Sequence, residues 1–328
     1  MVCRYYRDMK TALITGISGQ DGRLLTNFLL KKQYEVVGMI SSLKKDFNYL
    51  EFPELSQVKF EVVDYNDLIQ ITKTIEKHKP DEIYNLTSLS SVAESFQKPI
   101  QTFELNSHFT IRLFEALSKY PNIKFYQASS SEMFGNQSIQ PMNELSEFRP
   151  TSPYAISKVT AHHAADFYRT AYGLQISCGI LFNHESYLRS SKFVSKKIIN
   201  GVANIVLGKS EKISLGSLTA IRDWGAAEDY VQAMWLMLQV DQPDDFVIAT
   251  GRPRSVLDFV STAFEAAGLK VDPLSKITID EGSFRKVDID AIWGDARKAK
   301  EILGWEPRIE FKEMVRKMLD YELYLASQ

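Results

Sequence analysis

A glycine-rich loop lies between an apolar run and a helical pattern near the start of the chain. The run at residues 11–15 has the composition of a buried strand, and Gly16, Gly19 and Gly22 follow at intervals of three. Apolar residues then recur at helical spacing over residues 24–29. This order predicts a dinucleotide site, because glycines let backbone amides and a helix N-terminus approach a pyrophosphate. Glycines that only shape a tight turn are the alternative.

Strand and helix patterns alternate along the first half of the chain. We expect strands at residues 11–15, 35–40, 59–63, 82–86, 124–128 and 175–182, and helices at 68–75, at 102–117 and from Tyr154 onward. Such alternation predicts a doubly wound α/β fold of the Rossmann type, with a parallel sheet covered by helices on both faces. Ligands bind these sheets at the carboxyl ends of the strands.

The second half of the chain has a less regular pattern. We expect helices at residues 193–207, 228–239, 256–267 and 311–324, and a short strand at 246–249. These elements predict a dinucleotide-binding domain at 9–182, to which 223–250 return, and a smaller mixed α/β substrate lobe made of 183–222 and 251–328. No linker or repeat separates the two parts, so they should share one interface.

Composition excludes several classes of function. The net charge of -2 gives no basic face for nucleic acid. Cys3 and Cys178 provide neither a disulfide framework nor a metal-ligand cluster, and they suit a reducing, cytoplasmic compartment. No apolar stretch approaches the roughly 20 residues of a membrane span. We therefore expect a cytoplasmic enzyme with small-molecule ligands, no metal and no membrane partner.

Four side chains near the expected fifth strand and the helix after it form the predicted catalytic group. Tyr154 and Lys158 lie one helical turn apart. An ammonium and a positive nicotinamide ring would favour the phenolate, which can take a hydroxyl proton as hydride leaves the carbon. Ser130 would hydrogen-bond the same hydroxyl. In an extended chain Glu132 would point to the same side as Ser130, and its carboxylate could remove a carbon-bound proton, which indicates a dehydratase.

The cofactor is expected to contact the glycine loop and the ends of several strands. The predicted binding residues are Gly16, Gly19, Gln20, Asp21, Gly22, Ser41, Ser42, Asp64, Leu86, Ser88, Tyr154 and Lys158. NAD sites commonly have a carboxylate after the second strand, whereas this chain has Ser41 and Ser42, followed by Lys44 and Lys45. Hydroxyls and lysines suit a ribose 2′-phosphate, so NADP is expected, with NAD as the alternative.

Five longer strings give the chain a resemblance to a known family. They are TGISGQDG at 15–22, FYQASSSEMFG at 125–135, SPYAISK at 152–158, ILFNHES at 180–186 and RDWGAAEDYVQAMWLML at 222–238. With these strings the chain resembles the GDP-mannose 4,6-dehydratases, which are extended short-chain dehydrogenase/reductases. The resemblance runs from about residue 12 to residue 308.

The resemblance implies a redox-neutral reaction on a GDP-sugar. Hydride passes from carbon 4 of the hexose to NADP, water leaves across carbons 5 and 6, and hydride returns to carbon 6. Tyr154 would be the base at the 4-hydroxyl, Lys158 its activator, Ser130 its hydrogen-bond partner and Glu132 the group that removes the carbon 5 proton. The residues implied to bind the substrate are Ser90, Asn183, Lys197, Arg222 and Arg285. A homodimer or homotetramer is also implied.

Three departures from the family pattern concern the ligands. Ser41 and Ser42 replace a pair of arginines, residues 187–190 read Tyr-Leu-Arg-Ser in place of Pro-Arg-Arg-Gly, and residues 285–288 read Arg-Lys-Val-Asp in place of Arg-Pro-x-Glu. The sugar could therefore be mannose, a heptose or N-acetylglucosamine. An NADP-dependent reductase or epimerase of a 4-keto GDP-sugar is the nearest alternative, and a non-catalytic cofactor sensor is a second one.

Overall fold

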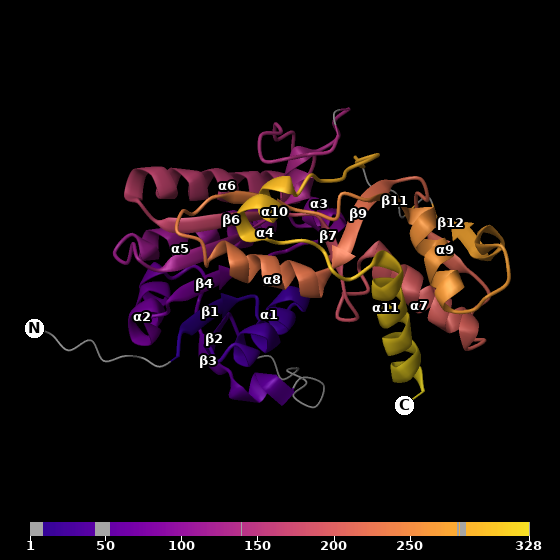
Figure 1. The fold of residues 1–328 in the computed structure, drawn as a ribbon, viewed down its shortest axis with the longest axis horizontal. Coiled ribbons are helices and arrows are strands. Elements are labelled where there is room, and N and C mark those ends of the chain that lie inside the picture. The colour runs from indigo at the N-terminus through magenta and orange to yellow at the C-terminus, as the bar shows by residue number, and fades with distance from the viewer. Residues whose placement is uncertain (1–8, 43–52, 139, 281, 283–286, 328) are drawn as a thin grey trace, which may run out of the picture.

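Seven parallel strands form the central sheet of the computed structural model, which describes residues 9–42, 53–138, 140–280, 282 and 287–327 (Figure 1). Their order is β10-β6-β5-β4-β1-β2-β3. The bounds are β1 (Thr11–Thr15), β2 (Glu35–Ile40), β3 (Lys59–Val62), β4 (Glu82–Asn85), β5 (Lys124–Ser130), β6 (Gln175–Leu181) and β10 (Asp245–Ile248). The predicted doubly wound α/β fold is confirmed.

Helices cover both faces of this sheet because its strands are apolar on both sides. On β1, Ile14 belongs to one buried cluster and Leu13 to another, as alternation along a strand requires. The first cluster is covered by α1 (Gln20–Lys31), α8 (Ala227–Met237) and α10 (Arg297–Leu303). The second is covered by α2 (Leu68–His78), α5 (Phe109–Leu117) and α6 (Pro153–Tyr172).

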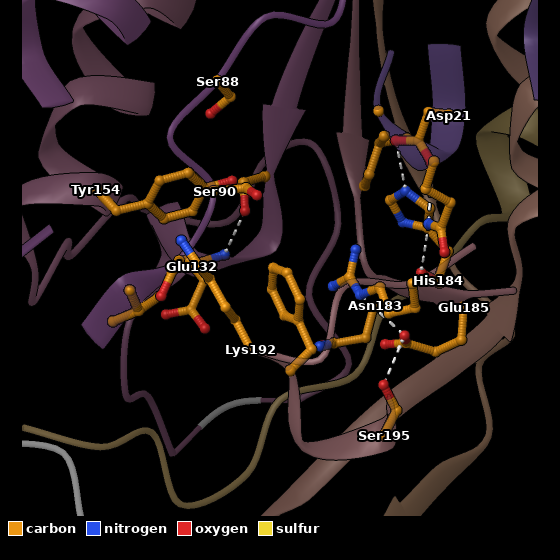
Figure 2. Close-up of a pocket in the computed structure, with 18 of the residues that line it drawn as sticks. Asp21, Ser88, Ser90, Glu132, Tyr154, Asn183, His184, Glu185, Lys192 and Ser195 are labelled. Carbon is orange, nitrogen blue, oxygen red and sulfur yellow. Dashed lines mark hydrogen bonds and ion pairs between the residues drawn. The ribbon is translucent and has the colours of Figure 1, made fainter. Parts of the chain in front are cut away.

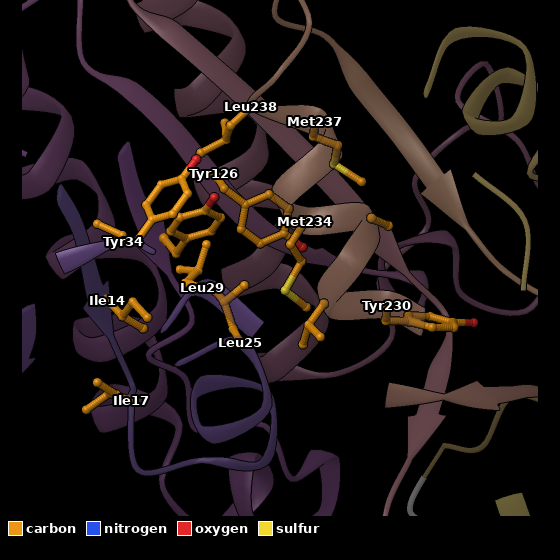
Figure 3. Packing of buried hydrophobic residues seen from close by; sticks show 14 of the residues in the cluster. Ile14, Ile17, Leu25, Leu29, Tyr34, Tyr126, Tyr230, Met234, Met237 and Leu238 are labelled. Atoms are coloured by element: carbon orange, nitrogen blue, oxygen red, sulfur yellow. The ribbon is translucent and has the colours of Figure 1, made fainter. Parts of the chain in front are cut away.

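The contact between α1 and α8 fixes the glycine loop relative to the second half of the chain. Leu25 and Leu29 of α1 and Met234 and Met237 of α8 belong to one buried cluster with Ile14 (Figure 3). Burying side chains of this size contributes about 1.5–3 kcal/mol each relative to exposing them. The start of α1 is therefore held by a packed core.

The helix expected at 102–117 is part of a longer helical segment. It consists of α4 (Pro99–Phe103), a π-helical turn (Glu104–His108) and α5, and α3 (Val92–Gln97) precedes it. Short 3₁₀ helices occur at Pro53–Gln57, Ser131–Phe134 and Pro273–Lys276.

The remaining elements form a separate part at one end of the molecule, with a buried cluster of its own (Figure 1). Its helices are α7 (Val194–Val206), α9 (Val256–Ala266) and α11 (Phe311–Ala326), and its short strands are β7 (Asn183–Glu185), β8 (Ile213–Leu215), β9 (Ile221–Ala226), β11 (Pro253–Ser255) and β12 (Ile277–Ile279). β9 pairs with β7 and β11, while β10 lies in the main sheet. The division into two domains at the expected residues stays a prediction.

The strand order indicates where ligands can bind. The strand order reverses between β1 and β4, and an open α/β sheet binds its ligands at the carboxyl ends next to such a reversal. None of the helices in the described residues is both long and apolar enough to cross a membrane.

Candidate active site

A cavity of about 1020 Å³ lies at the carboxyl ends of the central strands (Figure 2). The predicted site residues in its wall are Gly16, Gly19, Gln20, Asp21, Gly22, Ser41, Ser42, Leu86, Ser88, Ser90, Ser130, Glu132, Tyr154, Lys158, Asn183, Lys197 and Arg222. Asp64 is not in the wall; its exposed carboxylate accepts a hydrogen bond from the Asn66 amide at 2.9 Å. Arg285, Lys44 and Lys45 lie outside the described residues. The cavity joins residues from both halves of the chain.

The glycine loop is shaped by close packing. Gly16 has φ +69°, and a Cβ there would lie 2.7 Å from the backbone of Leu86. A Cβ on Gly22 would lie 2.5 Å from the Gly16 carbonyl oxygen. Gly19 is the N-cap residue of α1 and provides no side-chain cap. The first amides of this helix therefore have no side-chain acceptor and can bind an anionic group.

Gln20 and Asp21 make contacts that the sequence did not indicate. The Gln20 amide donates to the His184 carbonyl at 3.1 Å and to Asp21 at 3.0 Å, while Ser186 donates to Gln20 at 2.9 Å. Nε2 of His184 lies 2.9 Å from the Asp21 carboxylate. Gln20 and Asp21 were predicted to bind the cofactor, and both line the cavity. Their side chains also join the start of α1 to β7.

Asp21 and His184 pair in the cavity wall, where His184 is buried and Asp21 is half-buried. His184 Nε2 faces a carboxylate and Nδ1 lies 2.8 Å from the Phe182 carbonyl oxygen, so both ring nitrogens have acceptors and the imidazolium form can donate through both. Burial alone would raise the pKa of Asp21, but His184 lowers it to about 2. Burial lowers the pKa of His184, yet Asp21 raises it above its usual value overall.

Tyr154 and Lys158 lie where α6 starts. Ser152 caps this helix by accepting from the Ala155 amide at 3.1 Å, and Pro153 occupies its first position. Tyr154 is therefore in the first turn and Lys158 in the next, both buried. Lys158 Nζ donates to the Ala128 carbonyl at 2.8 Å and lies 5.8 Å from the centre of the Tyr154 ring.

Burial shifts the pKa values of both groups in the chain without cofactor. Burial raises the pKa of Tyr154 to about 12, although a hydrogen bond with Ser130 acts in the opposite direction. Burial also lowers the pKa of Lys158 to about 8, and the charge of Asp21 opposes that shift. The protein groups alone therefore hold Tyr154 as a phenol. Formation of the phenolate requires a further positive charge near the ring.

Glu132 lines the cavity, but its backbone conformation differs from the expected one. The extended conformation expected through this residue is wrong, because β5 ends at Ser130 and Glu132 lies in the 3₁₀ turn at Ser131–Phe134. Ser130 Oγ accepts from the Glu132 amide at 3.3 Å. Figure 2 shows Glu132 beside Tyr154, and its charge acts on the phenol. A carboxylate, a phenol and a hydroxyl thus border one end of the cavity.

The opposite wall carries several cations that the structure pairs with acids. Arg189 lies 2.9 Å from the Glu185 carboxylate and stacks on Phe193, and Ser195 also donates to Glu185 at 2.7 Å. Lys192 donates to Glu94 of α3 at 2.7 Å. In the sequence, Arg189 was noted only because residues 187–190 differ from the family pattern. No sequence pattern indicated a role for Lys192.

Arg222, a predicted substrate residue, donates mainly to protein groups. Its guanidinium bonds to the carbonyl oxygens of Ile221 and Ile289 at 2.9 and 2.7 Å and to Asp288 at 2.9 Å. Arg222 is buried, and both Arg222 and Asp288 line the cavity. Its orientation is therefore fixed by the protein.

The cavity fits a nicotinamide dinucleotide. Its volume is at the upper end of the range for ligand sites. Ser88 Oγ lies in the wall and is buried without a hydrogen-bond partner among the described residues. Buried hydroxyls rarely stay unpaired, so this one is suited to a ligand atom. The uncapped amides at the start of α1 can bind the pyrophosphate, and the Lys158 ammonium can donate to a ribose hydroxyl.

The fold and the Tyr-x-x-x-Lys site define an extended short-chain dehydrogenase/reductase. A family model described as GDP-mannose 4,6 dehydratase matches residues 13–318. Arabidopsis thaliana GDP-mannose 4,6 dehydratase 2 is 43% identical, over 97% of this chain and 88% of the relative. The human GDP-mannose 4,6 dehydratase is 41% identical, over 96% and 91%. The chain belongs to the GDP-mannose 4,6-dehydratase family.

Solved structures support the fold independently. The UDP-glucose 4-epimerase of Thermotoga maritima superposes with a TM-score of 0.83 at 22% identity, covering 97% of this chain and 99% of that one. The dTDP-glucose 4,6-dehydratase of Bacillus anthracis, in complex with NAD, gives a TM-score of 0.82 at 21% identity, covering 95% and 96%. At these identities the likeness concerns the fold alone.

Proposed function

We propose that this chain is a GDP-sugar 4,6-dehydratase acting on GDP-mannose or a closely related GDP-sugar. The observation that carries the proposal is the convergence of Ser130, Tyr154, Lys158 and Glu132 on one cavity. A phenol and an ammonium serve an alcohol oxidation, and the added carboxylate serves removal of a carbon-bound proton. Membership of the dehydratase family supports the same reaction.

Tyr154 and Glu132 carry out different proton transfers in this reaction. A bound nicotinamide supplies the chemistry of accepting hydride from carbon 4 and returning it to carbon 6. Tyr154 takes the proton of the 4-hydroxyl, while Ser130 hydrogen-bonds the same oxygen. The ketone formed at carbon 4 acidifies the neighbouring C–H bond, so Glu132 can remove the carbon 5 proton. Glu132 then helps to protonate the hydroxyl that leaves carbon 6 as water. When hydride returns to carbon 6, a proton that exchanges with solvent is added to carbon 5.

Lys158 has two tasks in this scheme. It favours the Tyr154 phenolate by its charge, and it holds the nicotinamide ribose. Its ammonium is oriented by the Ala128 carbonyl at 2.8 Å, so it enters the reaction already positioned. Asp21, whose charge raises the Lys158 pKa against the effect of burial, helps to keep it protonated.

The cofactor and substrate would occupy different parts of the cavity. Gly16, Gly19, Gly22, Ser41 and Ser42 line the cofactor part. Among solved structures of this fold, the Bacillus anthracis enzyme contains NAD, and RMD from Pseudomonas aeruginosa is complexed with NADPH. We propose NADP for this chain, because hydroxyls stand where NAD enzymes commonly have a carboxylate.

The substrate diphosphate would lie against the wall formed by β7, α7 and β9. Asn183, Lys197 and Arg222 supply the donors there, with Ser90 on the opposite side. We propose that Arg285, from the segment next to Asp288, completes this group. The homodimer or homotetramer and the cytoplasmic location inferred from the sequence remain part of the proposal.

The reaction is tested by mass spectrometry of GDP-mannose incubated with the protein in deuterated water. We expect the product to have lost one water and to carry solvent deuterium at carbon 5. Glu132→Gln serves as the control, and it should form no dehydrated product. GDP-mannose that returns unchanged would exclude it as substrate, and GDP-linked heptose and N-acetylglucosamine would then be assayed. Reduction or epimerisation of a 4-keto GDP-sugar without loss of water would overturn the dehydratase.

A further inference from the structure

β5 extends beyond its neighbour β4 at the edge of the sheet that borders the cavity. Its pairing with β4 ends at Gln127, whereas its pairing with β6 continues to Ser130. Segments with fewer contacts are less firmly held, so the position of Ser130 depends on contacts from outside the sheet. The helix α6 supplies such contacts.

Two side chains of α6 contact this end of β5. Lys158 Nζ donates to the Ala128 carbonyl at 2.8 Å, and one helical turn later His162 Nδ1 lies 3.0 Å from Ser129 Oγ. His162 and Ser129 are both buried, with exposed fractions of 5% and 4%. These two bonds hold α6, which carries the predicted base Tyr154, against the end of β5.

The imidazole of His162 is itself held from the other side. Its Nε2 lies 3.5 Å from the carboxylate of Asp245 in β10, which also accepts from Arg169. The ring of Phe148 packs edge-on against the imidazole, with ring centroids 5.1 Å apart. Because Nε2 faces a carboxylate, the tautomer with a proton on Nε2 is favoured, and Nδ1 then accepts from the Ser129 hydroxyl.

The surroundings of His162 determine its charge. The titratable groups around it are Arg169, His163 and Asp166 of α6, Asp245 of β10 and Cys178 of β6. Burial has the largest effect and lowers the pKa of His162 below its usual value. The imidazole therefore stays neutral at neutral pH and above, so its bond to Ser129 does not change in the range in which a phenol titrates.

We propose that His162 is a positioning residue of the candidate active site. By holding Ser129 against α6, it keeps the next residue, Ser130, within hydrogen-bonding distance of the Tyr154 hydroxyl. Ser129 lies in the cavity wall, and His162 contacts it from behind. The inference deepens the proposed function and rests on it only in taking Tyr154 as the base.

The consequence is measurable on Tyr154 itself. Burial raises the pKa of Tyr154 to about 12, and the hydrogen bond with Ser130 acts against that effect. Weakening this bond through His162 should therefore raise the pKa further. The charged groups around the phenol, all of which the variants leave in place, are Lys158 of the same helix, Glu132 after β5, Arg189 after β7 and Asp21 of α1.

The test is a titration of Tyr154 by nuclear magnetic resonance in the full chain with NADP⁺ bound. Tyrosine Cζ is isotope-labelled, and the Tyr154 resonance is identified by its absence from Tyr154→Phe. His162→Leu removes the hydrogen bond to Ser129. Since this weakens one hydrogen bond to the phenol, we expect the titration midpoint of Tyr154, its apparent pKa, to rise by roughly 0.4–1 pH unit.

Three further variants accompany His162→Leu. Ser129→Ala removes the same hydrogen bond from the β5 side and should raise the midpoint too, which keeps the proposal testable if His162→Leu does not fold. His162→Asn places an amide close to the position of Nδ1 and should restore the original midpoint. His163→Leu, at the exposed neighbouring histidine, is the matched control and should leave the midpoint unchanged.

Ser130→Ala separates positioning from packing. In that background the bond between Ser130 and Tyr154 is already lost, so His162→Leu should cause no further change in the midpoint. An unchanged midpoint in both His162→Leu and Ser129→Ala, or an equal rise with and without Ser130, would refute the assignment. The titration does not depend on turnover, so failure of the dehydratase assay would leave its result intact.

Discussion

Tyr154 is the residue whose proton transfer starts the proposed reaction. Tyr154→Phe removes only the hydroxyl and keeps the buried ring, so the fold should be preserved. Because general base catalysis contributes about 10²–10⁴-fold, we expect turnover to fall by roughly that factor. Cofactor affinity should stay close to that of the unaltered chain. Steady-state assays and cofactor titration measure the two effects, and undiminished turnover would contradict the role of Tyr154.

Lys158 should contribute to function at the expense of stability. Its pKa in the folded chain is about 8, below the ordinary 10.5 because of burial. Below about pH 8 Lys158 is protonated in both the folded and the unfolded chain, and burial of its charge destabilises the folded chain. As pH rises from about 8 to 10.5, the unfolded chain keeps a proton that the folded chain has released, so stability increases.

Lys158→Met should therefore stabilise the fold while abolishing turnover. At neutral pH we expect a gain of about 1–3 kcal/mol in the free energy of unfolding, after allowing for the lost hydrogen bond to Ala128. The gain should shrink as pH approaches the ordinary pKa of lysine. Urea denaturation of the cofactor-free chain at several pH values measures it. Lys197→Met, at an exposed lysine of the same cavity, should change stability little, and a destabilised Lys158→Met would refute the argument.

At the scale of elements, the structure joins α1 to β7 through polar side chains. Asp21 and Gln20 come from the first turn of α1, and His184 from the centre of β7. α1 starts the proposed pyrophosphate site, and β7 carries Asn183 in the substrate wall. The bridge therefore fixes the cofactor and substrate sides of the cavity relative to each other.

A double-mutant cycle on Asp21→Asn and His184→Gln should reveal this bridge. Residues in contact couple by about 0.5–3 kcal/mol, and we expect a coupling energy within that range here. The Asp21 contribution is present above its ordinary pKa of 3.8 and is lost as pH falls toward 2. The His184 contribution is present below 6.5 and is lost as pH rises through its raised pKa.

The coupling should therefore be largest between about pH 4 and 6.5. Urea denaturation of the four proteins across this range gives the coupling energy. Ser186→Ala, which removes a neighbouring hydrogen bond to Gln20 but no charge, is the control and should show no such pH profile. Additive effects of the two substitutions at every pH would show that the ion pair does not stabilise the fold.

On the scale of the whole molecule, the sequence predicts most of the central sheet. Strands buried on both faces are apolar runs, and β2 was expected at the residues where it occurs, 35–40. The strands β7, β8, β11 and β12 have three residues each, too few to show a period, and they were not expected.

The cavity was predictable only in part. Residues at the ends of strands could be assigned to it because parallel strands end at one edge. The contact between Asp21 and His184 spans 163 positions and depends on how α1 meets the second half of the chain. The spacing of residues in a short stretch of sequence cannot reveal such a long-range contact. The turn at Glu132 was missed for another reason, because the strand pattern of β5 gives no signal of where the extended chain ends.

The closed redox cycle of the proposed reaction leads to a prediction about the isolated protein. Since hydride is returned in each turnover, the cofactor need not leave, and we expect the purified chain to carry a bound nicotinamide dinucleotide. Mass spectrometry of the nucleotide released on denaturation measures its identity and amount. An empty site after purification at neutral pH would contradict the prediction.

Two variants then separate oxidation from elimination within the same cavity. Glu132→Gln can oxidise the sugar but cannot remove the carbon 5 proton, so adding GDP-mannose should produce the absorbance of reduced nicotinamide, and it should persist. Tyr154→Phe cannot take the hydroxyl proton, so its nicotinamide should stay oxidised. The same absorbance in both variants, or in neither, would mean that the phenol and the carboxylate do not act in the proposed order.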